Sequence, residues 1–90
     1  MLQTVSILVT GKVQGVFYRA TAKDVADQLG IKGWVKNLPD NNVEIKATAS
    51  EEILQKFTDW CKQGPPKARV EDVIVEELSL EEFNGFTIIR

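Results

Sequence analysis

The chain has 90 residues, of which 43% are hydrophobic and 27% are charged, and its formal net charge at pH 7 is −2. This length and composition predict one soluble globular domain over residues 1–90, with a two-layer core that needs no disulfide or structural metal. The slightly negative charge argues against a general binder of nucleic-acid backbones, so any bound anion is expected to be small.

Hydrophobic periodicity predicts seven elements along the chain. Short runs of β-branched residues that alternate with polar ones are typical of strands, and apolar residues recurring at i, i+3, i+4 and i+7 are typical of helices. In chain order we expect a strand at 4–10 ended by Gly11, a helix at 18–29, strands at 31–37 and 43–49, a helix between Ser50 and Gly64, and strands at 69–78 and 85–90.

The first turns of the two helices differ in how clearly the sequence marks them. Ser50 is a good N-cap for the second helix, because its hydroxyl can accept a hydrogen bond from a free amide of the first turn. The first helix has two possible starts. Thr21 and Asp24 have the spacing of a capping box, which favours a start at Thr21, whereas the tight loop before them favours a start near Phe17.

This order of elements predicts an α+β fold, a ferredoxin-like βαββαβ sandwich. Its two helices cover one face of an antiparallel sheet, and a short fifth strand follows at the C-terminal end. A strand, a returning helix and a second strand make the first two strands run the same way, so their ends emerge at one edge. With the third strand between them they lie about 10 Å apart. Asn37 is therefore expected to share an edge with the loop after the first strand.

The counts of histidine and cysteine limit the catalytic and metal-binding chemistry that this chain can perform. The sequence contains no histidine, which excludes a histidine general base, Ser-His-Asp systems and His-ligated metals. Cys61 is the single cysteine, so no internal disulfide can form, and its place on the apolar stripe of the second helix predicts a buried thiol. No signal peptide or membrane-spanning run is evident, and we expect a cytoplasmic protein.

The segment from Gly11 to Arg19 reads GKVQGVFYR and joins a strand to a helix. Successive amides of such a loop, with the positive end of a helix behind them, favour a phosphate group. The planar fork of Arg19 can bond two phosphate oxygens. A tight turn with glycines for backbone geometry is the plain alternative for the loop, and hydrogen bonding within the Pro-Asp turn is the plain alternative for Asn37.

Three motifs taken together resemble the acylphosphatases, small enzymes that hydrolyse carboxyl-phosphate anhydrides. They are GKVQGVFYR at 11–19, GWVKN at 33–37 and GPPKARVEDV at 64–73, and the resemblance spans nearly the whole chain. It implies that Arg19 is the phosphate-binding arginine and that Asn37 positions the attacking water. The resemblance also places a phosphate cradle on the backbone amides of Gln14, Gly15, Val16, Phe17, Tyr18 and Arg19.

The resemblance implies metal-independent hydrolysis of an acyl phosphate, without a cofactor, by a monomer with no nucleic-acid or membrane partner. A carboxylate leaving group needs little protonation, so the missing histidine fits this chemistry. The chain departs from the family at Lys36, where arginine is common, and at Asn41, where glycine is common. Lysine keeps the charge, and asparagine tolerates a left-handed backbone.

Two other classes of function are consistent with the order of elements. RNA-recognition modules share it, but the strand at 43–49 has no aromatic residue on which a base can stack. A non-catalytic domain that binds a small anion or a partner stays open on fold alone, although the presence of both Arg19 and Asn37 favours a hydrolase. The acidic run from Glu76 to Glu82 is expected to be solvated. The sequence leaves open the physiological substrate and whether the terminal carboxylate of Arg90 reaches the site.

Overall fold

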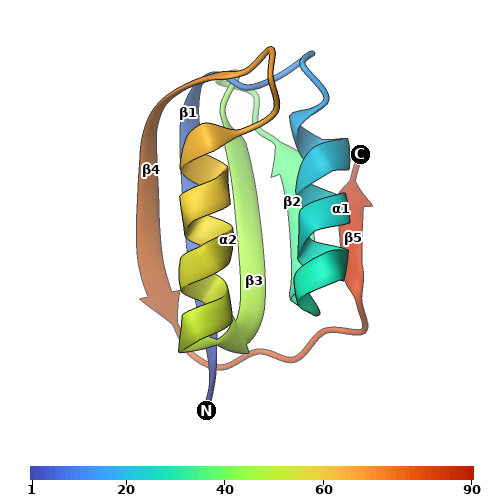
Figure 1. Cartoon of the computed structure of the whole chain (residues 1–90), viewed down its shortest axis with the longest axis vertical. Helices are drawn as coiled ribbons and strands as arrows, with labels where there is room; N and C mark the ends of the chain where they lie inside the picture. Colours follow the sequence, from blue (N-terminus) through green and yellow to red (C-terminus); the bar gives the residue numbers. More distant parts are fainter.

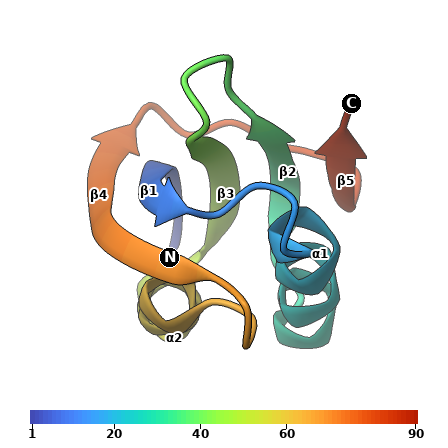
Figure 2. The same ribbon diagram turned by 90° about the horizontal axis from the view of Figure 1, so that it is seen from above.

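The predicted elements all form, and both helices lie on one face of a five-stranded sheet (Figures 1 and 2). The computed structural model describes residues 1–90. The elements are β1 (Leu2–Lys12), α1 (Tyr18–Leu29), β2 (Lys32–Asn37), β3 (Val43–Ser50), α2 (Glu51–Gln63), β4 (Arg69–Leu78) and β5 (Phe86–Ile89). Neither helix is long and apolar enough to cross a membrane.

The strand order β4-β1-β3-β2-β5 confirms the ferredoxin-like arrangement and the position of β3 between β1 and β2. The pairs β1–β3, β1–β4 and β2–β3 are antiparallel, but β5 pairs parallel to β2, so the sheet is mixed. The four strands of the βαββαβ sandwich are antiparallel, as predicted, and the short fifth strand, whose direction was not predicted, adds one parallel pair. After β4 the chain crosses the sheet at the end where β2 begins, and β5 then runs in the same direction as β2 (Figure 1).

Gly11 does not end the first strand, contrary to the sequence prediction. β1 continues to Lys12, and its register with β4 shifts between Thr10 and Gly11. At Gly11 φ is 120°, and a Cβ there would lie 2.2 Å from the carbonyl oxygen of Arg69. Only glycine can occupy this register shift, because it has no Cβ. The shift allows β1 to remain paired with β4 as far as Lys12, next to the loop.

The two helices begin in different ways. The Ser50 N-cap is confirmed, because its hydroxyl accepts a hydrogen bond from the Ile53 amide at 3.4 Å. α1 begins at Tyr18, as the tight loop favoured, with Phe17 as an N-cap that makes no side-chain hydrogen bond. The capping box at Thr21 is wrong, because the Thr21 hydroxyl instead donates to the carbonyl oxygen of Phe17 at 2.8 Å.

The core lies between the sheet and the helices. The inward residues of β1 and β3 are buried against α1 and α2, and Phe57 and Tyr18 are the largest fully buried side chains. Cys61 is fully buried, which confirms its expected place in the core. The Tyr18 hydroxyl donates to the Cys61 carbonyl oxygen at 2.8 Å, so one hydrogen bond links the first turn of α1 to the last turns of α2.

Burial of Cys61 makes the stability of the fold depend on pH in alkali. Burial raises the pKa of the thiol to about 12, whereas the thiol of an unfolded chain ionises at its ordinary pKa. Above that value the unfolded state loses a proton that the folded state keeps, so stability falls as pH rises. We expect a loss of about 1.5 kcal/mol between about pH 8 and about pH 10, measured by urea unfolding. The Cys61→Ala variant should show a flatter profile, and an equally steep one would contradict the assignment.

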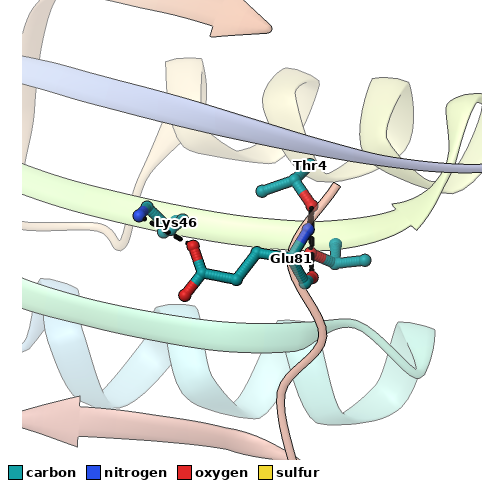
Figure 3. Close-up of polar contacts among 4 residues, drawn as sticks. Thr4, Lys46 and Glu81 are labelled. Atoms are coloured by element: carbon teal, nitrogen blue, oxygen red, sulfur yellow. Dashed lines mark hydrogen bonds and ion pairs between the residues drawn. The ribbon is translucent and has the colours of Figure 1, made fainter. Parts of the chain in front are cut away.

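The segment between β4 and β5 is fastened across the helix-free face of the sheet at Glu81 (Figure 3). The Thr4 hydroxyl accepts a hydrogen bond from the Glu81 amide at 2.8 Å, and the Thr48 hydroxyl donates to the Glu81 carbonyl oxygen at 2.7 Å. Lys46 lies 3.0 Å from the Glu81 carboxylate. These bonds fix the path of the chain to β5. The glutamates of the run 76–82 are exposed, as expected, and Glu81 in addition fastens the segment to the sheet.

Candidate active site

One edge of the sheet brings together the ends of β1, β2 and β5 and the start of α1 (Figures 1 and 2). A pocket of about 290 Å³ lies there. Five of the predicted site residues line it, Gly15, Phe17, Tyr18, Arg19 and Asn37, together with Val13, Ala20, Ile88 and Arg90. The structure therefore joins Arg19 and Asn37, which lie on different elements, in one pocket.

Gln14 and Val16, the other two predicted cradle residues, do not line the pocket. The Val16 side chain is buried in the core. The Gln14 side-chain amide donates to the carbonyl oxygens of Leu38 and Asn42, at 2.8 Å each. This clamp between the loop and the β2–β3 turn was not predicted, because nothing local in the sequence marks acceptors so distant along the chain.

The backbone amides of the loop have no hydrogen-bond acceptor within the protein. Among the loop, turn and cap hydrogen bonds, none uses an amide between residues 14 and 20 as its donor, and the first is Thr21 to Phe17 at 3.0 Å. The first turn of α1 contains no acidic residue. These donors, at the positive end of the helix, are available to an external anion.

Arg19 is half-buried and its charge is not neutralised by any carboxylate. The three ion pairs of the protein join Lys23 to Asp27, Lys36 to Glu44, and Lys46 to Glu81. No Asp or Glu lines the pocket, and the C-terminal residue Arg90 is part of its wall. Arg19 itself forms no ion pair, so its fork is available for two oxygens of one anion.

Asn37 is the last residue of β2, and its side-chain oxygen Oδ1 is buried without a hydrogen-bond partner. None of the hydrogen bonds within the following turn uses the Asn37 side chain, and the Asn42 amide there donates to the Asp40 carboxylate at 3.2 Å. The alternative that Asn37 serves this turn is therefore wrong. A buried acceptor without a donor costs about 1–3 kcal/mol. Such an atom in a pocket is suited to accept a hydrogen bond from a bound molecule, for example water.

Gly33 sets the path of the strand that ends at Asn37. A Cβ at Gly33 would lie 1.8 Å from the Lys46 carbonyl oxygen, so β2 and β3 approach more closely than any other residue allows. Trp34 faces the helix-free side, with the Lys36 and Lys46 amines 5.0 and 5.9 Å from its ring centroid. The Lys36 side chain, where this chain departs from the family, thus lies on the helix-free side and faces away from the pocket.

The turn after β2 contains Asn41, whose φ is 74°. This confirms that asparagine supports the left-handed backbone of the turn.

A larger hollow of about 510 Å³ lies at the opposite end of the molecule and includes Leu29, Ile53 and Phe83. It contains none of the predicted site residues, so the chemistry points to the smaller pocket.

Comparison with known proteins agrees with this geometry. The acylphosphatase family model matches residues 5–88. The acylphosphatase of Methylococcus capsulatus is 44% identical over 90 residues, which cover 99% of this chain and 98% of that protein. The acylphosphatase of Acaryochloris marina is 48% identical over 83 residues, 92% of this chain and 89% of that protein. The crystal structure of the Bacillus subtilis acylphosphatase superposes with a TM-score of 0.95 at 42% identity and covers both chains completely. Similarity over the full length, in sequence and in fold, shows that this chain belongs to the acylphosphatase family.

Proposed function

We propose that this acylphosphatase cleaves acyl phosphates in the 290 Å³ pocket without a metal or cofactor. The amides of the loop residues Gly15, Phe17, Tyr18 and Arg19, which line the pocket, form the phosphate cradle together with those of Gln14 and Val16, whose side chains lie outside the pocket. The Arg19 guanidinium binds two phosphoryl oxygens, and Asn37 orients the attacking water. The free amides and the unpaired charge of Arg19 support this assignment, and no Asp, Glu, His or Cys side chain lines the pocket as a metal ligand.

In the proposed reaction the oxygen of water attacks phosphorus in line with the bond to the acyl oxygen. That bond breaks, and its electron pair leaves with the carboxylate, which needs no general acid. The proton lost by water goes to the transferred phosphate, so an acyl phosphate dianion yields a carboxylate and a phosphate monoanion. The protein's task is to hold the equatorial oxygens and place the water.

The observation that carries the proposal is the buried, unpartnered Oδ1 of Asn37 in the same pocket as Arg19. A site that only binds an anion needs donors, whereas a carboxamide oxygen is an acceptor and repels phosphate oxygens. An acceptor beside a phosphate site is useful when a water molecule must be oriented there. This favours hydrolysis over the alternative of a non-catalytic anion-binding domain.

The test is hydrolysis of benzoyl phosphate in excess chelator, with phenyl phosphate as the phosphomonoester control. We expect the first to be cleaved and the second to persist. Binding of inorganic phosphate without turnover of benzoyl phosphate would instead establish an anion receptor. Loss of activity in chelator, restored by a divalent cation, would contradict the metal-independent mechanism.

Substituting Asn37 by alanine should lower kcat for benzoyl phosphate about 100-fold, equivalent to about 2.7 kcal/mol of transition-state stabilisation. Inhibition by inorganic phosphate should change little, because Asn37 acts on water. The free energy of unfolding should not fall, since alanine removes an unsatisfied buried acceptor. Asn84→Ala, which removes an exposed amide outside the pocket, is the matched control. A kcat within threefold of the parent for Asn37→Ala would refute the role of Asn37.

The same proposal extends to the state of the protein in the cell. We infer that residues 1–90 act as one domain and as a monomer, in the cytoplasm, on a small-molecule substrate. The lone buried cysteine suits a reducing compartment. Sedimentation of the active protein at assay concentration tests the monomer.

A further inference from the structure

Phe17 combines two unfavourable features at the pocket. It has φ 65° and ψ 23°, a left-handed conformation that glycine or asparagine adopts more easily. Its side chain is also 76% exposed, although it is large and apolar. Strained residues persist where the surrounding structure imposes them, and they cluster at functional sites.

The strain at Phe17 serves the phosphate cradle, but the ring does not. Phe17 is the N-cap of α1, and its carbonyl oxygen accepts hydrogen bonds from the amide and the hydroxyl of Thr21. Only the backbone takes part in these contacts, and glycine would supply the same backbone with less strain. A separate reason is therefore needed for a phenyl ring at this position.

The composition of the pocket wall suggests that reason. Arg19, Asn37 and the loop amides account for the phosphoryl group and the water. Phe17, on the loop, and half-buried Ile88, on β5, are apolar residues of the same wall that this assignment leaves without a role. The acyl group of a bound substrate has to lie next to its phosphoryl group, beside these walls.

We propose that Phe17 is a specificity-determining residue that contacts the acyl group and favours aromatic or bulky apolar acyl phosphates over acetyl phosphate. The inference rests on the proposed function, because it takes the phosphoryl group to occupy the cradle. An apolar acyl group covers the exposed ring and is itself removed from water, whereas an acetyl group is too small to cover it. The resulting preference should appear mainly in KM, since the contact is present before and during the reaction.

The test compares kcat/KM for benzoyl and acetyl phosphate in the parent, Phe17→Gly and Phe17→Leu. In Phe17→Gly the benzoyl-to-acetyl ratio should fall about tenfold, through KM for benzoyl phosphate. Phe17→Leu keeps an apolar side chain at the same strained backbone and should retain most of the ratio. Thermal stability of Phe17→Gly should equal or exceed that of the parent, because glycine relieves the positive φ.

The matched control is Leu80→Ala, which removes another exposed apolar side chain (58% exposed) outside the pocket. It should leave the ratio unchanged. An unchanged ratio in Phe17→Gly, or an equal fall with both substrates from a loosened cradle, would overturn the inference and leave the hydrolase assignment intact. Failure of the parent to hydrolyse either substrate would overturn the proposed function, and the inference with it.

Discussion

Arg19→Gln is expected to lower kcat/KM for benzoyl phosphate about 1000-fold, a loss of about 4 kcal/mol of transition-state stabilisation. Charge spreads over the equatorial oxygens of the phosphoryl group during transfer, and a planar guanidinium can donate to two of them at once. Arg19 forms none of the protein's ion pairs, so its charge is available in full to the substrate. Glutamine keeps an N–H donor, but it is two bonds shorter and has neither the charge nor the fork.

Two further variants separate charge from geometry at this position. Arg19→Lys restores the charge without the fork and should recover only part of the lost activity. Arg69→Gln removes an exposed arginine outside the pocket and should change kcat/KM less than twofold. The quantities to compare are kcat/KM and the inhibition constant of inorganic phosphate, which should weaken in Arg19→Gln. If Arg19→Gln keeps more than a tenth of the parent's activity, the arginine does not hold the transferred group.

Gly33→Ala should have the largest effect on stability, a loss of at least about 3 kcal/mol in the free energy of unfolding. A Cβ at this position would lie 1.8 Å from the carbonyl oxygen of Lys46 and 2.8 Å from its carbonyl carbon, at φ 150°. The obstacle is backbone, so no side-chain rotation can relieve it. β2 would have to move away from β3, and the bond from the Gly33 amide to the Gly85 carbonyl oxygen on its other side would be lost.

The matched control for Gly33 is Gly30→Ala. Gly30 also has a positive φ, 73°, but a Cβ there meets no atom within 4 Å. The Gly30→Ala variant should therefore lose only about 1–2 kcal/mol in the free energy of unfolding, which is the cost of a left-handed backbone at a residue with a Cβ. Urea unfolding of both variants measures the difference, and similar losses for the two would show that the close approach of β2 to β3 is not what requires glycine at Gly33.

The predictions that hold depend on short-range patterns. The Ser50 cap, the alternation of β3 and the periodicity of α1 and α2 each involve residues within a few positions of one another, so the chain specifies them before any long-range contact forms. The same applies to the glycine-containing loop and to the arginine at the start of α1. Two local signals competed for the start of α1, the capping-box spacing at Thr21 and the tight loop that ends at Phe17. The helix begins at Tyr18, directly after the loop, because the left-handed backbone of Phe17 turns the chain into the first helical turn.

By itself the sequence determined the order of the elements, the two-helix face and five of the nine residues that line the pocket. Tertiary structure alone decided that β5 runs parallel to β2, that Gln14 clamps the loop to the β2–β3 turn, and that Asn37 ends with an unpartnered oxygen. Each of these depends on groups that are far apart in the chain and meet only after the strands have paired. Periodicity and motif spacing describe neighbours along the chain, whereas strand direction, side-chain clamps and unsatisfied atoms are properties of the packed whole.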